Sequence, residues 1–279
     1  MIIWLCSYPK SGNTYIRAFL SAYYFTNDGI FDFELLKFIE QFPDKQFYKK
    51  FIKTKDEAAK QWLPLQKEFI KSGKIKFLKT HSAYGSYDKN PFTTPETTLG
   101  GIYIVRDPRN VVSSLMNHFS INEGDALKMM NNVHRNLRDR NDKDNYATYS
   151  FISSWDKNYK SWKLTKNINK ILIKYEDLEK DIENTFLKII KFTNKIMRKN
   201  DEINFEKLRK SIKTTEFDLL KKKEEKEGFD EAIYSSDNSK TKAFFNLGRN
   251  NDYKKLLNNK TIKSIEESFG EEMKELGYL

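Results

Sequence analysis

Four short apolar segments recur along the chain, and a polar turn and a helical spacing of apolar positions follow each of them. The segments cover 2–6, 75–78, 101–105 and 171–175. Apolar runs of this length, without alternation, are typical of strands that are buried on both faces of a parallel sheet. We therefore expect an α/β fold in which a central parallel sheet is flanked by helices.

The remaining pattern is mostly helical. Helices are predicted over 13–25, 108–119, 150–166 and 183–194. The segment 31–73 has apolar residues at helical spacing and is expected to form helical insertions, whereas the polar segment 120–149 is expected to be a loop or an irregular helix. The charged run 221–228 fits the end of a solvated helix, or alternatively a mobile lid. No repeat or linker divides the chain, so one domain is expected over 1–279.

Composition narrows the range of partners and locations. The chain has 50 Lys and Arg against 39 Asp and Glu, a net charge of +11. Such an excess favours anionic partners, although a general bias toward lysine would also produce it. The single cysteine, Cys6, allows no intrachain disulfide and favours a reducing, cytoplasmic location. No stretch reaches the roughly 20 apolar residues of a membrane span, and no signal-peptide pattern is seen.

A loop rich in hydrogen-bond donors follows the first predicted strand. It reads Tyr8-Pro9-Lys10-Ser11-Gly12-Asn13-Thr14-Tyr15. A strand, a glycine-bearing turn and a helix N-terminus together favour phosphate binding, because free backbone N–H groups converge there. Lys10 precedes Gly12, so the order differs from a Walker A loop. A simple helix N-cap made by Ser11, Asn13 or Thr14 is the alternative.

The third predicted strand leads into a second candidate anion site. Arg106 follows that strand directly, and Ser114 lies eight residues later, two turns into a helix whose first turn contains Pro108. An arginine in this place could hold a phosphate through two parallel hydrogen bonds. The alternative is a capped helix with an Arg–Asp pair at the surface.

The second predicted strand ends in Lys79-Thr80-His81. Because the carboxyl ends of parallel strands meet at one edge of the sheet, we expect His81 to lie near the donor-rich loop. Neutral imidazole could take a proton from an attacking group, and Lys10 could offset charge on a leaving oxygen. A histidine after a strand can also be purely structural.

Taken in this order, the motifs resemble the donor signature of the cytosolic-type sulfotransferases, which use 3′-phosphoadenosine-5′-phosphosulfate (PAPS). The resemblance implies a P-loop-kinase-like sulfotransferase fold and transfer of a sulfuryl group to a hydroxyl or amine, with release of PAP and no metal requirement. It implies that the loop 8–15 binds the 5′-phosphosulfate. Arg106 and Ser114 would then bind the 3′-phosphate, His81 would be the catalytic base, and Lys79 would assist the sulfuryl oxygens.

The resemblance also assigns residues to the adenine ring. Tyr15 stands where the family usually has a stacking tryptophan, and Tyr175 would contact the same ring. Thr215 and Phe217 resemble the family's adenine-cradling stretch. Core packing is the alternative for these aromatic side chains.

The last family motif is altered in this chain. The family usually has Arg-Lys-Gly for the 3′-phosphate, and this chain has Asn246-Leu247-Gly248. Gly248 is kept, and Arg249 or Lys242 could replace the missing cations. This departure puts the strength of 3′-phosphate binding in question.

The acceptor and the oligomeric state are left open. An acceptor pocket is expected from 25–73, 82–98 and 120–150, for a small molecule or a glycan that carries a hydroxyl or amine. No nucleic-acid partner is expected. A P-loop-type nucleotide kinase and a non-catalytic polyanion-binding protein stay as alternatives from the residues alone.

Overall fold

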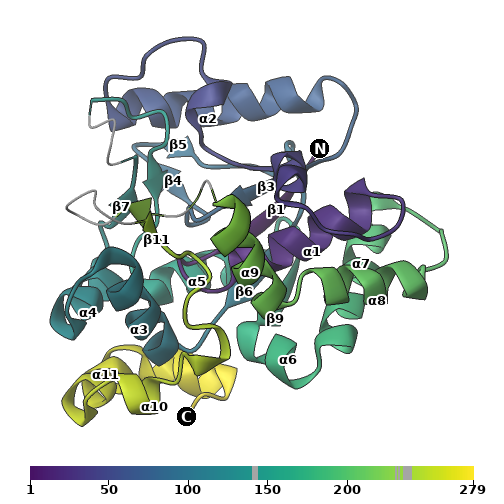
Figure 1. Ribbon diagram of the computed structural model, residues 1–279. Coiled ribbons are helices and arrows are strands. Elements are labelled where there is room, and N and C mark those ends of the chain that lie inside the picture. Colours follow the sequence, from purple (N-terminus) through teal and green to yellow (C-terminus); the bar gives the residue numbers. More distant parts are fainter. Residues whose placement is uncertain (140–143, 230, 232, 235–240) are drawn as a thin grey trace. The chain divides into compact units, whose positions relative to one another are not determined.

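The computed structural model describes residues 1–139, 144–229, 231, 233–234 and 241–279 (Figure 1). The chain forms two compact units, and each is described by itself. Unit 1 contains 1–13, 37–105 and 132–203, and unit 2 contains 14–36, 106–131 and 204–279. The expected single domain stays a prediction.

A five-stranded parallel sheet forms the centre of unit 1, with the strand order β2-β3-β1-β6-β9. The strands are β1 (Ile2–Ser7), β2 (Ile39–Gln41), β3 (Lys76–Thr80), β6 (Thr98–Val105) and β9 (Asn169–Lys174). Four of them confirm the apolar segments of the sequence. The edge strand β2 corrects the expectation of a purely helical 31–73. It has only three residues, and Ile39 alone is buried, so it gives no strand pattern.

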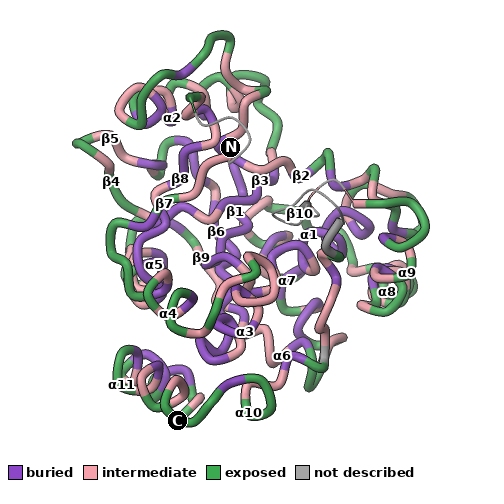
Figure 2. The backbone as a smooth tube through the Cα atoms, turned by 60° about the vertical axis from the view of Figure 1, so that its left-hand side comes forward, coloured by how far each residue is buried: buried purple, intermediate pink, exposed green. Residues whose placement is uncertain are grey.

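Burial explains why β1 is apolar throughout. All residues from Ile2 to Cys6 are fully buried, and Figure 2 shows this strand within the buried part of unit 1. The Cys6 thiol donates to the carbonyl oxygen of Ile102 on β6, at 3.4 Å. Burial raises the pKa of Cys6 well above its ordinary value. The thiol is therefore a packed, protonated side chain.

Helices cover the sheet within unit 1. They are α2 (Lys55–Ile70), α5 (Trp155–Leu164), α6 (Tyr175–Lys180) and α7 (Ile182–Met197). Helix α7 packs on β6 and β9, and a Cβ atom on Gly100 would lie 2.8 Å from Ile196. These observations confirm the expected α/β class with a parallel sheet and flanking helices.

Short antiparallel pairs complete unit 1. Strand β4 (Ser86–Tyr87) pairs with β5 (Asn90–Pro91), and β7 (Asn136–Leu137) pairs with β8 (Ser150–Phe151). The β8 strand corrects the predicted helix over 150–166, because α5 begins only at Trp155. Ser153 has a left-handed φ of 65° just before it, which separates strand from helix.

Unit 2 is mostly helical. Its elements include α3 (Pro108–Phe119), α4 (Glu123–Asn131), α8 (Phe205–Thr214), α9 (Phe217–Glu227), β10 (Ile233–Tyr234), β11 (Thr241–Lys242), η3 (Gly248–Asn250), α10 (Tyr253–Leu256) and α11 (Asn259–Leu276). Helix α1 (Asn13–Phe25) has all but its first residue in this unit, and η1 (Phe33–Phe38) begins here. A core cluster joins α1 to α9. It contains Ala18, Ala22, Phe31, Leu36, Leu220 and Phe245.

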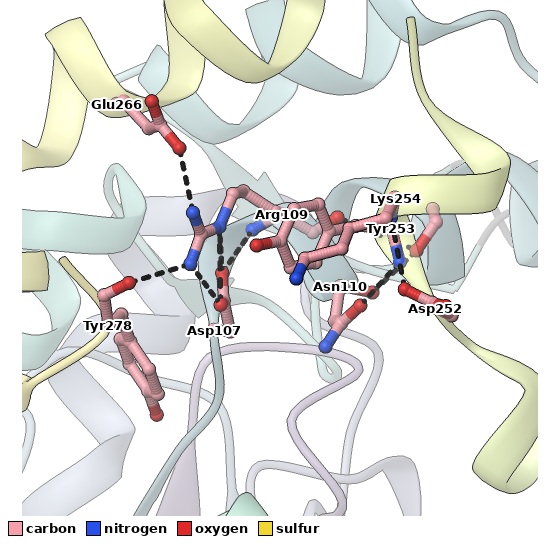
Figure 3. Close-up of polar contacts among 9 residues, drawn as sticks. Asp107, Arg109, Asn110, Asp252, Tyr253, Lys254, Glu266 and Tyr278 are labelled. Atoms are coloured by element: carbon pink, nitrogen blue, oxygen red, sulfur yellow. Dashed lines mark hydrogen bonds and ion pairs between the residues drawn. The ribbon is translucent and has the colours of Figure 1, made fainter. Parts of the chain in front are cut away.

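A buried arginine fixes the start of α3. Figure 3 shows Arg109 surrounded by Asp107, Glu266 and Tyr278. The guanidinium makes hydrogen bonds to both oxygens of Asp107, to Glu266 at 2.7 Å and to the carbonyl oxygen of Tyr278 at 2.8 Å. Burial alone would lower the pKa of Arg109, but the hydrogen bonds to Asp107 and Glu266 and the charge of Asp107 raise it. Arg109 is thus a structural cation that ties α3 to α11.

Candidate functional site

The strand register of unit 1 brings two predicted site segments to one edge of the sheet. Cys6 on β1 lies opposite Thr80 on β3, and each strand ends within one residue of this pair. The donor-rich loop leaves β1 at Tyr8, and His81 leaves β3 at the same level. The carboxyl edge of a parallel sheet is where ligands bind in α/β folds.

The backbone of the loop has the shape of an anion cradle. Lys10 has a φ of 68° and Gly12 has a φ of 95°, so two left-handed residues alternate with ordinary ones just before α1. Such alternation turns successive N–H groups toward one point. A Cβ atom on Gly12 would lie 2.3 Å from Cδ2 of Tyr175. The structure therefore brings the Tyr175 ring directly against the loop, where only glycine leaves room for it.

Ser11 provides a test of whether this loop fits a phosphate. Its side chain is fully buried, and its Oγ atom has no hydrogen-bond partner within the described part of the chain. Buried hydroxyl groups in folded proteins nearly always have a partner. A phosphate or sulfate oxygen would supply one, so the loop fits the expected donor.

Asn13 is directed away from a ligand. Its Nδ2 donates to the Leu5 carbonyl oxygen at 3.1 Å and to Ser7 Oγ at 3.2 Å. Both amide hydrogens are committed to β1, so the side chain holds the end of that strand in place. Its backbone N–H, at the first position of α1, is the group it can offer to an anion.

Ser7 contacts one ring nitrogen of His81. Nδ1 lies 2.8 Å from the carbonyl oxygen of Ser7 and 3.3 Å from Ser7 Oγ. A carbonyl oxygen can only accept, so this contact assigns the proton to Nδ1. In the neutral imidazole, Nε2 then carries the lone pair. That is the tautomer required if His81 is to take a proton from an acceptor.

Asn158 on α5 supports the main chain at His81. Its Nδ2 donates to the carbonyl oxygens of His81 and Ile152, at 3.0 and 2.8 Å. Its Oδ1 accepts from the hydroxyl of Tyr103 at 2.8 Å. Lys79, two residues before His81, is buried within β3 with 4% exposure. Asn158 was not predicted from the sequence, because an isolated asparagine in a helix has no distinctive pattern.

The predicted 3′-phosphate residues lie in unit 2. Arg106 follows β6 directly and is 7% exposed, while Ser114 is half-buried on α3. The neighbouring Ser113 is the more tightly bound serine, since its hydroxyl donates to Asn251 Oδ1 at 2.5 Å.

The predicted adenine-cradling stretch is brought against Gly248. Gly248 has a φ of 51°, and a Cβ atom there would lie 2.4 Å from Cε1 of Phe217. Thr215 is fully buried, and its hydroxyl donates to the Ser211 carbonyl oxygen at 2.7 Å. In unit 2, as in unit 1, an aromatic ring packs directly against a glycine that is predicted to bind the donor.

The start of α1 faces a carboxylate within unit 2. Arg17 forms an ion pair with Glu231, and Thr14 Oγ1 lies 3.5 Å from the same carboxyl group. Tyr15, the predicted stacking residue, packs against the core cluster. The structure therefore places Thr14 beside an acidic group and Tyr15 beside apolar ones.

The altered motif before Gly248 is held by polar contacts. Asn246 donates to Asn117 at 3.1 Å. The backbone N–H groups of Phe244 and Phe245 donate to the carboxylate of Glu224, at 2.6 and 2.8 Å. Glu224 is buried within the charged run 221–228. Its spacing of four from the buried Leu220 is the signal that could have revealed it.

The side chains of Arg249 and Lys242 lie outside the described residues, so their role as substitute cations stays a prediction. Across the described ranges, no helix has the length and apolar character needed to cross a membrane. Within those same ranges, no group of three or more His, Cys, Asp or Glu side chains could hold a metal ion.

Comparisons with known proteins show the family of this chain and its fold. The chain matches the sulfotransferase domain over residues 2–277. Mouse sulfotransferase SULT7A1, solved with PAP, is 19% identical with a TM-score of 0.60, over 98% of this chain and 84% of that one. Retinol dehydratase with androsterone and the inactive cofactor PAP is 15% identical with a TM-score of 0.59, over 98% and 80% of the two chains.

A second retinol dehydratase structure, with retinol and PAP, is 16% identical with a TM-score of 0.59, over 98% and 81% of the two chains. A comparison with curated protein sequences gives no match. The structural likenesses confirm the sulfotransferase fold, and the domain match covers almost the whole length. The chain belongs to the sulfotransferase domain family.

Proposed function

We propose that this sulfotransferase moves the sulfuryl group of PAPS to a hydroxyl or amine of a small-molecule or glycan acceptor, with His81 as the base. The contact between His81 Nδ1 and the Ser7 carbonyl oxygen carries this proposal, because it places the proton of the neutral imidazole on Nδ1 and the lone pair, which can accept a proton, on Nε2. Family membership supports the reaction over the nucleotide-kinase and polyanion-binding alternatives. The relatives' structures contain PAP, which supports PAPS as donor.

The chemistry assigns a role to each group. Nε2 of His81 takes the acceptor proton as the acceptor oxygen forms a bond to sulfur. The bond between sulfur and the 5′-phosphate oxygen breaks on the opposite side, by analogy with in-line phosphoryl transfer. Lys10 and the N–H groups of the loop offset the charge that grows on the departing phosphate, and Lys79 assists the sulfuryl oxygens. No metal is needed for these steps.

The residues proposed to bind the donor are those that the family resemblance implies. Lys10, Ser11, Gly12, Asn13 and Tyr175 would meet the 5′ end and the adenine. The other residues proposed for the donor are Thr14, Tyr15, Arg106, Ser114, Thr215, Phe217, Gly248 and Arg249. A cytoplasmic location is proposed from the single cysteine.

The test of the base is a histidine substitution. His81→Ala is expected to lower kcat by about 10²- to 10⁴-fold, which is the usual contribution of a general base. PAP affinity, measured by calorimetry, is expected to change little. His134→Ala, at an exposed position, is the matched control. Turnover retained in His81→Ala would remove His81 from this role, and failure of the wild type to bind PAP would contradict the donor assignment.

A further inference from the structure

Arg135 is a buried cation that the proposed chemistry does not use. It lies in unit 1, just before β7, and is 5% exposed. Its Nη1 donates to the hydroxyl oxygen of Tyr8 at 2.5 Å. Its Nη2 is buried and makes no hydrogen bond within the described residues, where it also has no carboxylate at ion-pair distance.

A charge in this position is costly unless an anion accompanies it. Removing a guanidinium from water without a paired, hydrogen-bonded anion disfavours folding strongly. Tyr8 does not supply the anion, because burial raises the pKa of its phenol to about 12 and the group is neutral at pH 7. Asp156 accepts from Ser154 Oγ at 2.5 Å and forms no ion pair with Arg135.

The same framework holds Arg135 and His81. Tyr8, the partner of Arg135, follows Ser7, whose carbonyl oxygen contacts the His81 imidazole. The Arg135 carbonyl oxygen accepts from Ile152 N at 3.0 Å, and Asn158 bridges the carbonyls of Ile152 and His81. All of these residues belong to unit 1. Arg135 and the proposed base are therefore held by one hydrogen-bonded framework.

We propose that Arg135 binds an anionic group of the acceptor, such as a carboxylate or a sulfate ester, near the hydroxyl that His81 deprotonates. The inference rests on the proposed function and narrows its acceptor to acidic hydroxyl compounds. Guanidinium groups suit such oxyanions because two N–H donors match two oxygens. Since Nη2 is covered in the free chain, neighbouring side chains move as the acceptor enters. The sulfuryl oxygens of the donor are the other anionic group that the Arg135 guanidinium could bind.

The experiment compares acids with their amides on the PAP-saturated protein. The probes are 4-hydroxybenzoate against 4-hydroxybenzamide, and glucuronate against glucuronamide. By calorimetry, the wild type is expected to bind at least one acid about 10- to 100-fold more tightly than its amide, the range for a hydrogen bond to a charged group. Arg135→Met is expected to abolish that preference.

Two variants control for folding and for general charge. Arg135→Met keeps side-chain volume, and replacing a buried charge by an apolar group is often tolerated, so its melting temperature is expected to be retained or raised. Arg135→Gln serves if Met disturbs packing. Arg138→Gln, three residues away, removes a cation that packs on Tyr146 at 4.6 Å, and it is expected to keep the preference.

The results bear differently on the role of Arg135 and on the proposed function. The inference is overturned if the wild type shows no preference for the acid in either pair, or if the preference survives in Arg135→Met. In both cases the sulfotransferase proposal stands. A raised KM for PAPS in Arg135→Met, measured with a neutral acceptor, assigns the guanidinium to the donor's sulfuryl oxygens instead. If the wild type fails to bind PAP, the proposed function is contradicted, whereas the proposed role of Arg135 is not.

Discussion

At the scale of single residues, Gly12 connects the loop conformation to the Tyr175 ring. Its φ of 95° is accessible mainly to glycine, and a Cβ atom would lie 2.3 Å from the ring. Both restrictions act on the same residue of the proposed phosphate loop. A larger side chain at Gly12 would therefore disturb both the loop backbone and the packing of the Tyr175 ring.

Gly12→Ala is expected to weaken PAP binding by at least about 10-fold, because the ring or the loop must shift. Calorimetry measures the change. Gly73→Ala is the matched control, since Gly73 also has a positive φ, of 70°, but a Cβ atom there meets nothing within 4 Å. Equal PAP affinity in the wild type and in Gly12→Ala would show that the loop does not need this contact.

Residues also show where sequence reasoning reaches its limit. The donor-rich loop and His81 were visible because a strand, a glycine and a charged or basic residue stand together. The orientation of Asn13 was not visible, because its amide bonds to Leu5 and Ser7 depend on how the loop folds back on β1. Arg135 was equally hidden, since a single arginine in a polar segment looks like any solvated one.

At the scale of elements, α9 does more than its charged sequence suggests. Glu224 turns inward and accepts two backbone N–H groups from Phe244 and Phe245. These residues precede the altered Asn246-Leu247-Gly248 motif. The helix therefore positions the segment in which the family's Arg-Lys pair is missing.

Glu224→Gln is expected to lower the free energy of unfolding by about 1–3 kcal/mol, because a charged acceptor of two buried N–H groups is lost. PAP affinity is expected to fall with it if Gly248 contacts the donor. Urea unfolding and calorimetry provide the two measurements. Glu225→Gln, exposed on the same helix, is the control, and a similar effect in both variants would rule out a specific role for Glu224.

Elements with strong local signals were predicted well. Helices α1 and α3 have the predicted bounds, since Gly12 and Pro108 mark where they begin. The short strands β2 and β8 were missed, because two or three residues are too few to show a period. Their pairing comes from neighbours that are distant in sequence.

At the scale of the whole molecule, buried tyrosines make the free energy of unfolding change with pH in the alkaline range. Burial raises the pKa of Tyr8 to about 12, and it also raises those of Tyr48, Tyr103 and Tyr149. The unfolded chain ionises near the ordinary value of 10, so it releases protons before the folded chain does. The stabilisation is complete below pH 10 and is lost as the pH rises toward 12.

The free energy of unfolding is therefore expected to fall steeply between about pH 10 and 12. Urea titrations at several pH values measure this slope. Tyr8→Phe is expected to have a shallower slope, because it removes one of the groups. An unchanged slope in Tyr8→Phe would mean that Tyr8 ionises alike in both states.

Cys6 gives the molecule a practical property. The only thiol of the chain is fully buried at the centre of the sheet, and its pKa is raised. Alkylating reagents react with the thiolate, so labelling of Cys6 should report rare openings of the sheet. A cysteine introduced at an exposed position would be modified first. The native chain is thus ready for attachment of a fluorophore or spin label without prior removal of its own cysteine.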